Sequence, residues 1–69
     1  MDLDRLAPRE REVAGLIVAK GEASASDICA GLSDPLSGAA VRTMLQRLRG
    51  KGVIRRRRAG RGFVYFPAW

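Results

Sequence analysis

A stripe of apolar side chains between residues 41 and 48 is the feature that most constrains the fold. Its members recur at the i, i+3, i+4, i+7 spacing of one helix face: Val41, Met44, Leu45 and Leu48. Ser37 is suited to cap the start of such a helix, and glycines at positions 50 and 52 are suited to end it. The pattern predicts a helix over residues 38–49 that buries this stripe.

Two shorter helices are expected before it. Pro8 suits the first position of a helix that Gly21 would end. Ser24 and Asp27 have the spacing of a capping box, which opens a second helix. Pro35 then bars that helix from continuing, so a turn must separate the second helix from the third.

The last third of the sequence has the pattern of a β-hairpin. An apolar pair and four arginines fill residues 53–58, and a glycine-containing segment, residues 59–62, follows them. Residues 63–67 are aromatic or β-branched and end in Pro67. Two strands joined by a turn are therefore predicted. Phe63, Tyr65 and Phe66 are expected in the core, because so small a domain needs its aromatic side chains inside.

Three helices followed by a hairpin are typical of a winged helix-turn-helix, an α+β fold. Helix 38–49 would be the reading element, and residues 55–66 would be the wing. The length of 69 residues allows one domain, residues 1–69. Cys29 has no second cysteine to pair with, and we expect it to be a small core residue.

The charge of the chain is divided between its two halves. Residues 1–34 carry seven carboxylates and four bases, whereas residues 35–69 carry nine bases and no carboxylate. Eleven of the thirteen bases are arginine, whose guanidinium binds phosphate and guanine in a bidentate manner. This separation of acidic and basic residues along the chain favours a polyanionic partner, and we expect that partner to be double-stranded DNA.

Several classes of function are disfavoured by what the sequence lacks. It has no histidine and only one cysteine, so we expect no enzyme activity, catalytic residue, metal site or cofactor. No small-molecule ligand is evident. The sequence contains no apolar run of membrane-spanning length and no recognisable signal peptide, which favours a cytoplasmic location without a membrane partner.

The side of helix 38–49 opposite the apolar stripe has the chemistry of a major-groove reader. Gln46 can pair with adenine and Arg42 with guanine, while the methyl groups of Ala39 and Thr43 can contact thymine. These four are the candidate base-reading residues.

Other residues are candidates for phosphate contacts, which position a domain without reading sequence: Ser37, Arg47, Arg49, Lys51 and Arg61. Arg61 lies at the expected hairpin tip and would touch the backbone or the minor groove. Along the wing, Arg55 and Arg57 would point to one side and the two neighbouring arginines to the other. Either pair could face DNA, with the other solvated or paired with carboxylates of the first half.

Three segments together resemble the penicillinase-repressor (BlaI/MecI) family: residues 41–48, residues 51–56, and residues 60–67. The resemblance implies a winged-helix transcriptional repressor whose third helix enters the major groove of a palindromic operator. It places Ser37, Arg42 and Thr43 where the family contacts DNA, and Arg47 and Arg61 at basic positions beside the backbone.

The sequence also departs from the family in two respects. Alanines stand at positions 39 and 40, where the family tends to have larger polar residues, so the operator sequence is left open. Family members continue into a C-terminal helical dimerisation region that carries the cleavage site for induction, whereas the sequence here ends at Trp69. We expect a monomer or weak dimer in free solution and a possible homodimer on DNA.

One other kind of DNA-binding domain and two other functions compete with this interpretation. The start of the sequence, residues 6–13, is similar to response-regulator output domains of the four-helix type. A winged helix can also be a protein-interaction module, which would expose an apolar patch. Binding of RNA would require the aromatic residues of the hairpin to be exposed.

Overall fold

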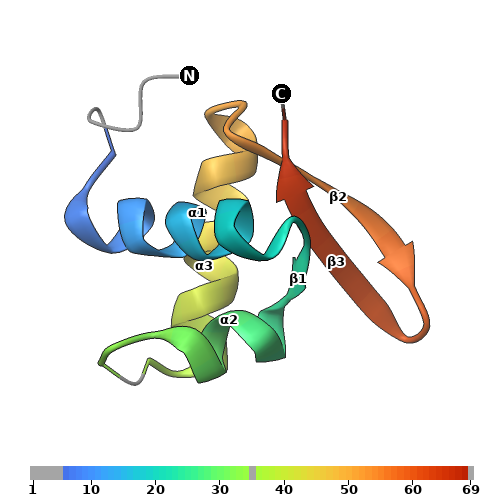
Figure 1. Cartoon of the computed structure of the whole chain (residues 1–69), viewed down its shortest axis with the longest axis horizontal. Helices are drawn as coiled ribbons and strands as arrows, with labels where there is room; N and C mark the ends of the chain where they lie inside the picture. Colours follow the sequence, from blue (N-terminus) through green and yellow to red (C-terminus); the bar gives the residue numbers. More distant parts are fainter. Residues whose placement is uncertain (1–5, 35, 69) are drawn as a thin grey trace.

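The described part of the chain folds into three helices followed by a twisted antiparallel hairpin. The computed structural model describes residues 6–34 and 36–68. The helices are α1 (Pro8–Lys20), α2 (Ala25–Gly31) and α3 (Gly38–Gly50), and the strands are β1 (Ala23–Ser24), β2 (Ile54–Ala59) and β3 (Gly62–Pro67). In Figure 1, α1 crosses in front of α3 and the hairpin extends away from the helices. The predicted α+β winged helix is confirmed.

Side-chain caps begin α2 and α3 where the sequence predicted. Ser24 Oγ accepts from the Asp27 amide, and Asp27 Oδ2 accepts from the Ser24 amide, both at 3.1 Å. This is a complete capping box at the start of α2. Ser37 Oγ accepts from the Ala40 amide at 3.1 Å and begins α3. Ala7 begins α1 without a side-chain cap, because alanine has no oxygen to offer.

The core lies where the three helices meet the sheet. The largest fully buried side chains come from all three helices: Val13, Ile17, Ile28, Val41, Leu45 and Leu48. Met44 completes the predicted stripe of α3, and Ile54 and Tyr65 close the core from the sheet. Cys29 is partly buried and packs against this core, as expected. The burial of its stripe fixes which side of α3 is exposed.

The sheet has one strand more than predicted. Its order is β1-β3-β2, with both pairings antiparallel. Ala23 lies opposite Tyr65 and Ser24 opposite Val64, which places β3 in the centre. A strand of two residues is too short to show the alternation by which strands are recognised, so β1 could not be predicted.

A two-residue turn sets the register of the hairpin. Ala59 lies opposite Gly62, and the intervening Gly60 has a φ of 62°. Since Arg61 keeps a negative φ, the loop has the positive first residue of a type II′ turn. Arg56 and Arg58 therefore share the inner face of the sheet, the one on which Tyr65 is buried.

This register corrects the expectation for the aromatic residues. Tyr65 is buried, and Phe63 packs against the core while remaining partly exposed. Phe66 lies opposite Arg55 on the outer face and is partly exposed, so its predicted core position is wrong. The reason is the alternation of side chains, since neighbouring residues 65 and 66 cannot both point inward.

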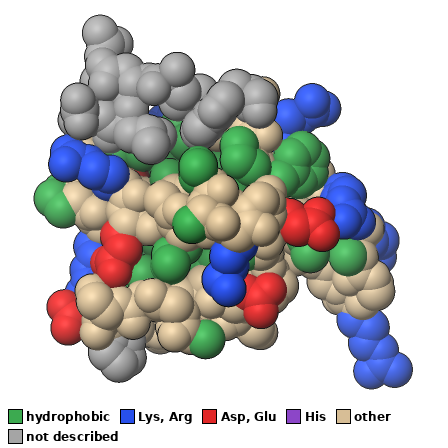
Figure 2. Space-filling view, in the orientation of Figure 1, with side chains coloured by type: hydrophobic (Ala, Val, Ile, Leu, Met, Phe, Trp, Pro, Cys, Tyr) green, Lys and Arg blue, Asp and Glu red, His purple; other side chains and the backbone are tan. Residues whose placement is uncertain are grey.

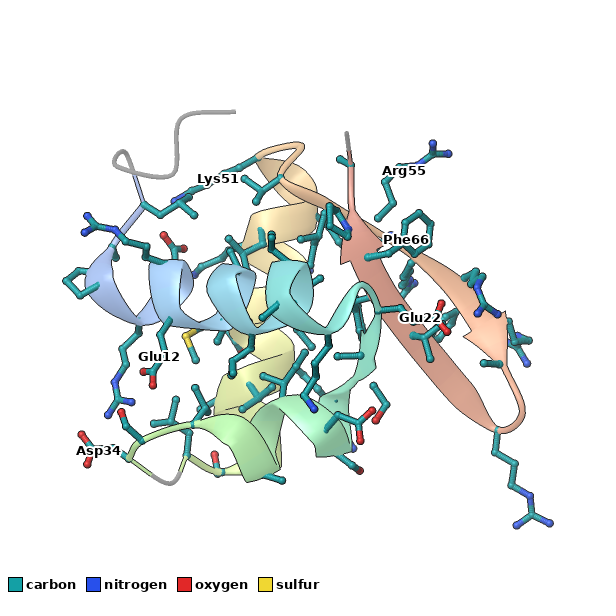
Figure 3. All side chains as sticks on the ribbon, viewed as in Figure 1. Glu12, Glu22, Asp34, Lys51, Arg55 and Phe66 are labelled. Carbon is teal, nitrogen blue, oxygen red and sulfur yellow. The ribbon has the colours of Figure 1, made fainter. Side chains whose placement is uncertain are left out.

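The turn between α2 and α3 is fastened to α1. Ser33 donates from its amide and its hydroxyl to Glu12 Oε2, at 3.0 and 2.8 Å. These two hydrogen bonds lower the pKa of Glu12. Arg9 Nη2 lies 3.1 Å from Asp34 Oδ2, and Figure 3 shows Glu12 and Asp34 at this end of the molecule. These contacts tie the segment that follows α2 to α1.

Candidate nucleic-acid interface

The exposed side of α3 carries all four predicted base-reading residues. Ala39, Arg42, Thr43 and Gln46 are exposed, whereas the apolar stripe of the same helix is buried. The Thr43 hydroxyl donates to the Ala39 carbonyl at 3.0 Å, so it is already satisfied within the helix. An α-helix with its side chains is about 10–12 Å in diameter, so a major groove about 12 Å wide can admit α3.

An open groove separates α3 from the hairpin. Arg42, Gln46 and Arg49 line it from α3, and Arg56, Gly62 and Phe63 line it from the hairpin. Its remaining lining is formed by the start of α2 and by the hairpin: Ser24, Ala25, Ser26 and Tyr65.

A second hollow adjoins the groove between the end of α3 and β2. Three side chains line both hollows: Gln46, Arg49 and Arg56. The structure therefore brings two predicted residues of α3 together with one wing arginine that the sequence had left unassigned.

Arg56 is held against an aromatic ring. Its guanidinium carbon lies 3.9 Å from the centre of the Phe63 ring, and that of Arg58 lies 5.5 Å away. A guanidinium over a ring face is attracted by the ring's quadrupole. Sequence reasoning missed Arg56 and Phe63 as partners. The two-residue turn was the signal that could have found them, because it sets Arg58 opposite Phe63.

On the outer face of the hairpin, one arginine forms an ion pair within the domain. Arg57 Nη2 lies 2.7 Å from Glu22 Oε2, and Figure 3 shows Glu22 between the end of α1 and the sheet. This is the pairing with a carboxylate of the first half that was expected for one set of wing arginines. The charge of Arg57 is thus offset within the domain.

Two predicted phosphate ligands lie away from the groove. Lys51 Nζ donates to the buried Glu10 Oε1 at 2.8 Å, and the Ala7 amide donates to the same oxygen at 3.1 Å. Figure 3 shows Lys51 reaching toward the start of α1. The pKa of Glu10 is lowered, first by the hydrogen bond from Lys51 and then by that from the Ala7 amide. The positive charges of Lys51 and Arg47 lower it further, and together these effects outweigh burial, which raises it. Phosphate contacts by Lys51 and Arg47 remain predictions.

The ion pairs leave the excess positive charge on α3 and the wing. Each carboxylate in the described ranges has a hydrogen-bonding partner: Glu10, Glu12, Glu22, Asp27 and Asp34. The bases of the second half without a carboxylate partner in those same ranges are Arg42, Arg47, Arg49, Arg55, Arg56, Arg58 and Arg61. Figure 2 shows acidic and basic groups mixed over α1 and basic groups along the hairpin.

The remaining predicted contacts lie at the two ends of this surface. Ser37 is exposed at the start of α3, where its hydroxyl caps the helix, and Arg61 is exposed in the hairpin turn. Between residues 6 and 68, Pro35 excepted, no three His, Cys, Asp or Glu side chains are grouped so as to hold a metal ion. None of the described helices is long and apolar enough to cross a membrane.

Comparison with known proteins agrees with the fold. The family model for the penicillinase repressor matches residues 6–69, which include every element of the winged helix. A search of curated proteins found no significant match to the sequence. The three helices, the basic hairpin and the match over nearly the whole length lead to one conclusion: the chain belongs to the penicillinase repressor family of DNA-binding transcriptional repressors.

Proposed function

We propose that this domain binds double-stranded DNA in a sequence-specific manner, with α3 in the major groove. The observation that carries the proposal is the exposed side of α3, which presents arginine, threonine and glutamine without any carboxylate. Arg42 and Gln46 supply the bidentate donors that distinguish guanine and adenine, and Ala39 and Thr43 supply methyl groups for thymine. Base reading is assigned to these four residues.

Phosphate contacts would fix the register of the domain on the duplex. Arg49 lies beside the reading residues, and Ser37 lies at the start of the same helix. Arg61 in the hairpin turn is assigned to the backbone or the minor groove. Arg47 and Lys51 would reach the backbone on the side of α3 nearest to α1, with Lys51 shared between a phosphate and Glu10.

A palindromic operator and a homodimer on DNA belong to the same proposal. One domain reads only a few base pairs, so its affinity is modest. Two domains on half-sites about 10 base pairs apart would gain from their effective concentration on the same duplex. A repressor of this kind acts where the chromosome is, and we therefore propose a cytoplasmic location.

Surface composition argues against a protein-interaction module. Val18 is the one large hydrophobic side chain in residues 6–34 and 36–68 that is exposed rather than buried or half-buried, at 44%. A single exposed valine does not make the apolar patch that such a module needs. Single-stranded nucleic acid is the second candidate, favoured by the partly exposed Phe63 and Phe66 beside the wing arginines.

Selection of bound sequences from random duplex DNA tests the proposal. We expect an enriched motif with two-fold symmetry, because two copies of α3 would read two half-sites. A set of bound sequences without any shared motif would contradict base reading. Tighter binding to single-stranded oligonucleotides of matched length would favour the second candidate instead.

A further inference from the structure

We infer that Arg56, held on the Phe63 ring, and Arg49 form a two-arginine clamp for one backbone phosphate of the duplex. The phosphate would lie in the groove between α3 and the wing. This inference rests on the proposed function and adds to it a site on the wing and a residue that positions it. Phe63 is a positioning residue, because its role in the clamp is to hold Arg56 and it does not itself contact the phosphate.

The first argument for the clamp is the position of the two arginines. Arg49 comes from α3 and Arg56 from β2, and both line each of the two adjoining hollows between these elements. Neither has a carboxylate partner among the residues that the structure describes. When α3 lies in the major groove and the wing lies beyond it, the strand between the two grooves must pass over this gap. A phosphodiester is the anion that is available there.

The second argument for the clamp is the contact between the Phe63 ring and Arg56. An arginine side chain loses much rotamer freedom when it binds a phosphate, which weakens the contact. The ring lies 3.9 Å from the Arg56 guanidinium carbon and already restrains it in the free domain. The same contact covers one face of the Phe63 ring, so this face is not open for stacking by a base of a single strand.

A set of variants tests the clamp in equilibrium titrations with a selected and a random duplex. One neutralised phosphate adds about −0.9 to the slope of log K against log salt. The double variant Arg49→Gln/Arg56→Gln empties the clamp, so its loss of affinity should be about eightfold larger at 0.1 M salt than at 1 M salt, and Arg56→Gln alone should show part of that loss. The loss should be equal on both duplexes. Arg58→Gln removes the same charge from the same face but lies outside the groove lining, and should cost less.

Phe63→Leu removes the ring and keeps every charge. We expect a loss of about two- to fivefold in affinity with the salt slope unchanged, and recovery in Phe63→Tyr, which keeps a ring face. The losses for Phe63→Leu and Arg56→Gln should be less than additive, while those for Phe63→Leu and Arg61→Gln should add. This pattern separates positioning from a general effect on folding.

Three results would overturn the inference in distinguishable ways. If the wild type binds duplex but Arg56→Gln costs no more than Arg58→Gln, the clamp is wrong and the proposed function stands. Additive losses for Phe63 and Arg56 would remove the positioning role. If the wild type binds single strands more tightly than duplex and Phe63→Leu abolishes that binding, both the clamp and the proposed function fail.

Discussion

The ion pair between Lys51 and Glu10 should stabilise the domain in a pH-dependent manner. Glu10 is buried, with a side chain only 6% exposed, and its carboxylate accepts from Lys51 Nζ at 2.8 Å. Lys51→Met keeps the aliphatic stem and removes the charged donor. A hydrogen bond to a charged group contributes about 1.5–3 kcal/mol. Because the lysine is 48% exposed, solvent screening lowers this to about 1–2 kcal/mol.

The loss is large relative to the stability of so small a domain. At about 0.05–0.15 kcal/mol per residue, 69 residues give roughly 3–10 kcal/mol in total. A loss of 1 kcal/mol lowers the Tm of such a domain by about 4–8 °C, so Lys51→Met should lower it by roughly 5–15 °C at pH 7. Thermal unfolding followed by circular dichroism measures this. Lys20→Met removes the same charge from an exposed site and is the matched control.

The pH dependence identifies the cause. The pKa of Glu10 is lower in the folded state than in the unfolded state, so its ionisation contributes stability above the unfolded value. That contribution is lost as the pH falls through the folded value. The difference in Tm between wild type and Lys51→Met should therefore be full at pH 7 and shrink below about pH 4. A difference that matches Lys20→Met, or one unchanged down to pH 3, would refute this account of Glu10.

Three further predictions concern salt, helix capping and assembly. If five or six phosphates are neutralised, the slope of log K against log salt should be roughly −5 for duplex DNA, and a slope near zero would exclude backbone binding. Ser24→Ala should cost about 1 kcal/mol and Ser26→Ala much less, since only Ser24 caps α2; equal shifts in Tm would contradict the capping role. Sedimentation at tens of micromolar should show a monomer or weak dimer, because little apolar surface is exposed in the described ranges; a tight dimer would contradict this.

The sequence predicted the parts of the fold that depend on neighbouring residues. The stripe of α3 and the capping box at Ser24 each involve residues within one or two turns of a helix, and both are confirmed. The predicted end of α3 at residue 49 was one residue short, because Gly50 continues the helix. Strand β1 was missed because it is formed only by pairing with β3, about 40 residues later in the chain.

The candidate site was harder to predict for the same reason. The contact between Lys51 and Glu10 joins residues 41 positions apart, and the residues next to either of them in the sequence do not predict it. The face of the sheet on which each wing arginine lies depends on whether the turn has two residues or three. A shift of one residue in the pairing moves each arginine to the opposite face. Once Ala59 pairs with Gly62, Arg56 must lie on the face of Phe63 and Arg57 on the face of Glu22.

The most direct test of base reading by α3 is the ratio of affinities for selected and random duplex. We predict that Arg42→Ala and Gln46→Ala each weaken binding to the selected duplex by about 1–3 kcal/mol and to random duplex much less. Arg61→Ala, at the hairpin tip, should weaken both equally and is the control. Equal losses on both duplexes for Arg42→Ala and Gln46→Ala would show that these residues contact only the backbone, and would contradict the assignment of base reading to α3.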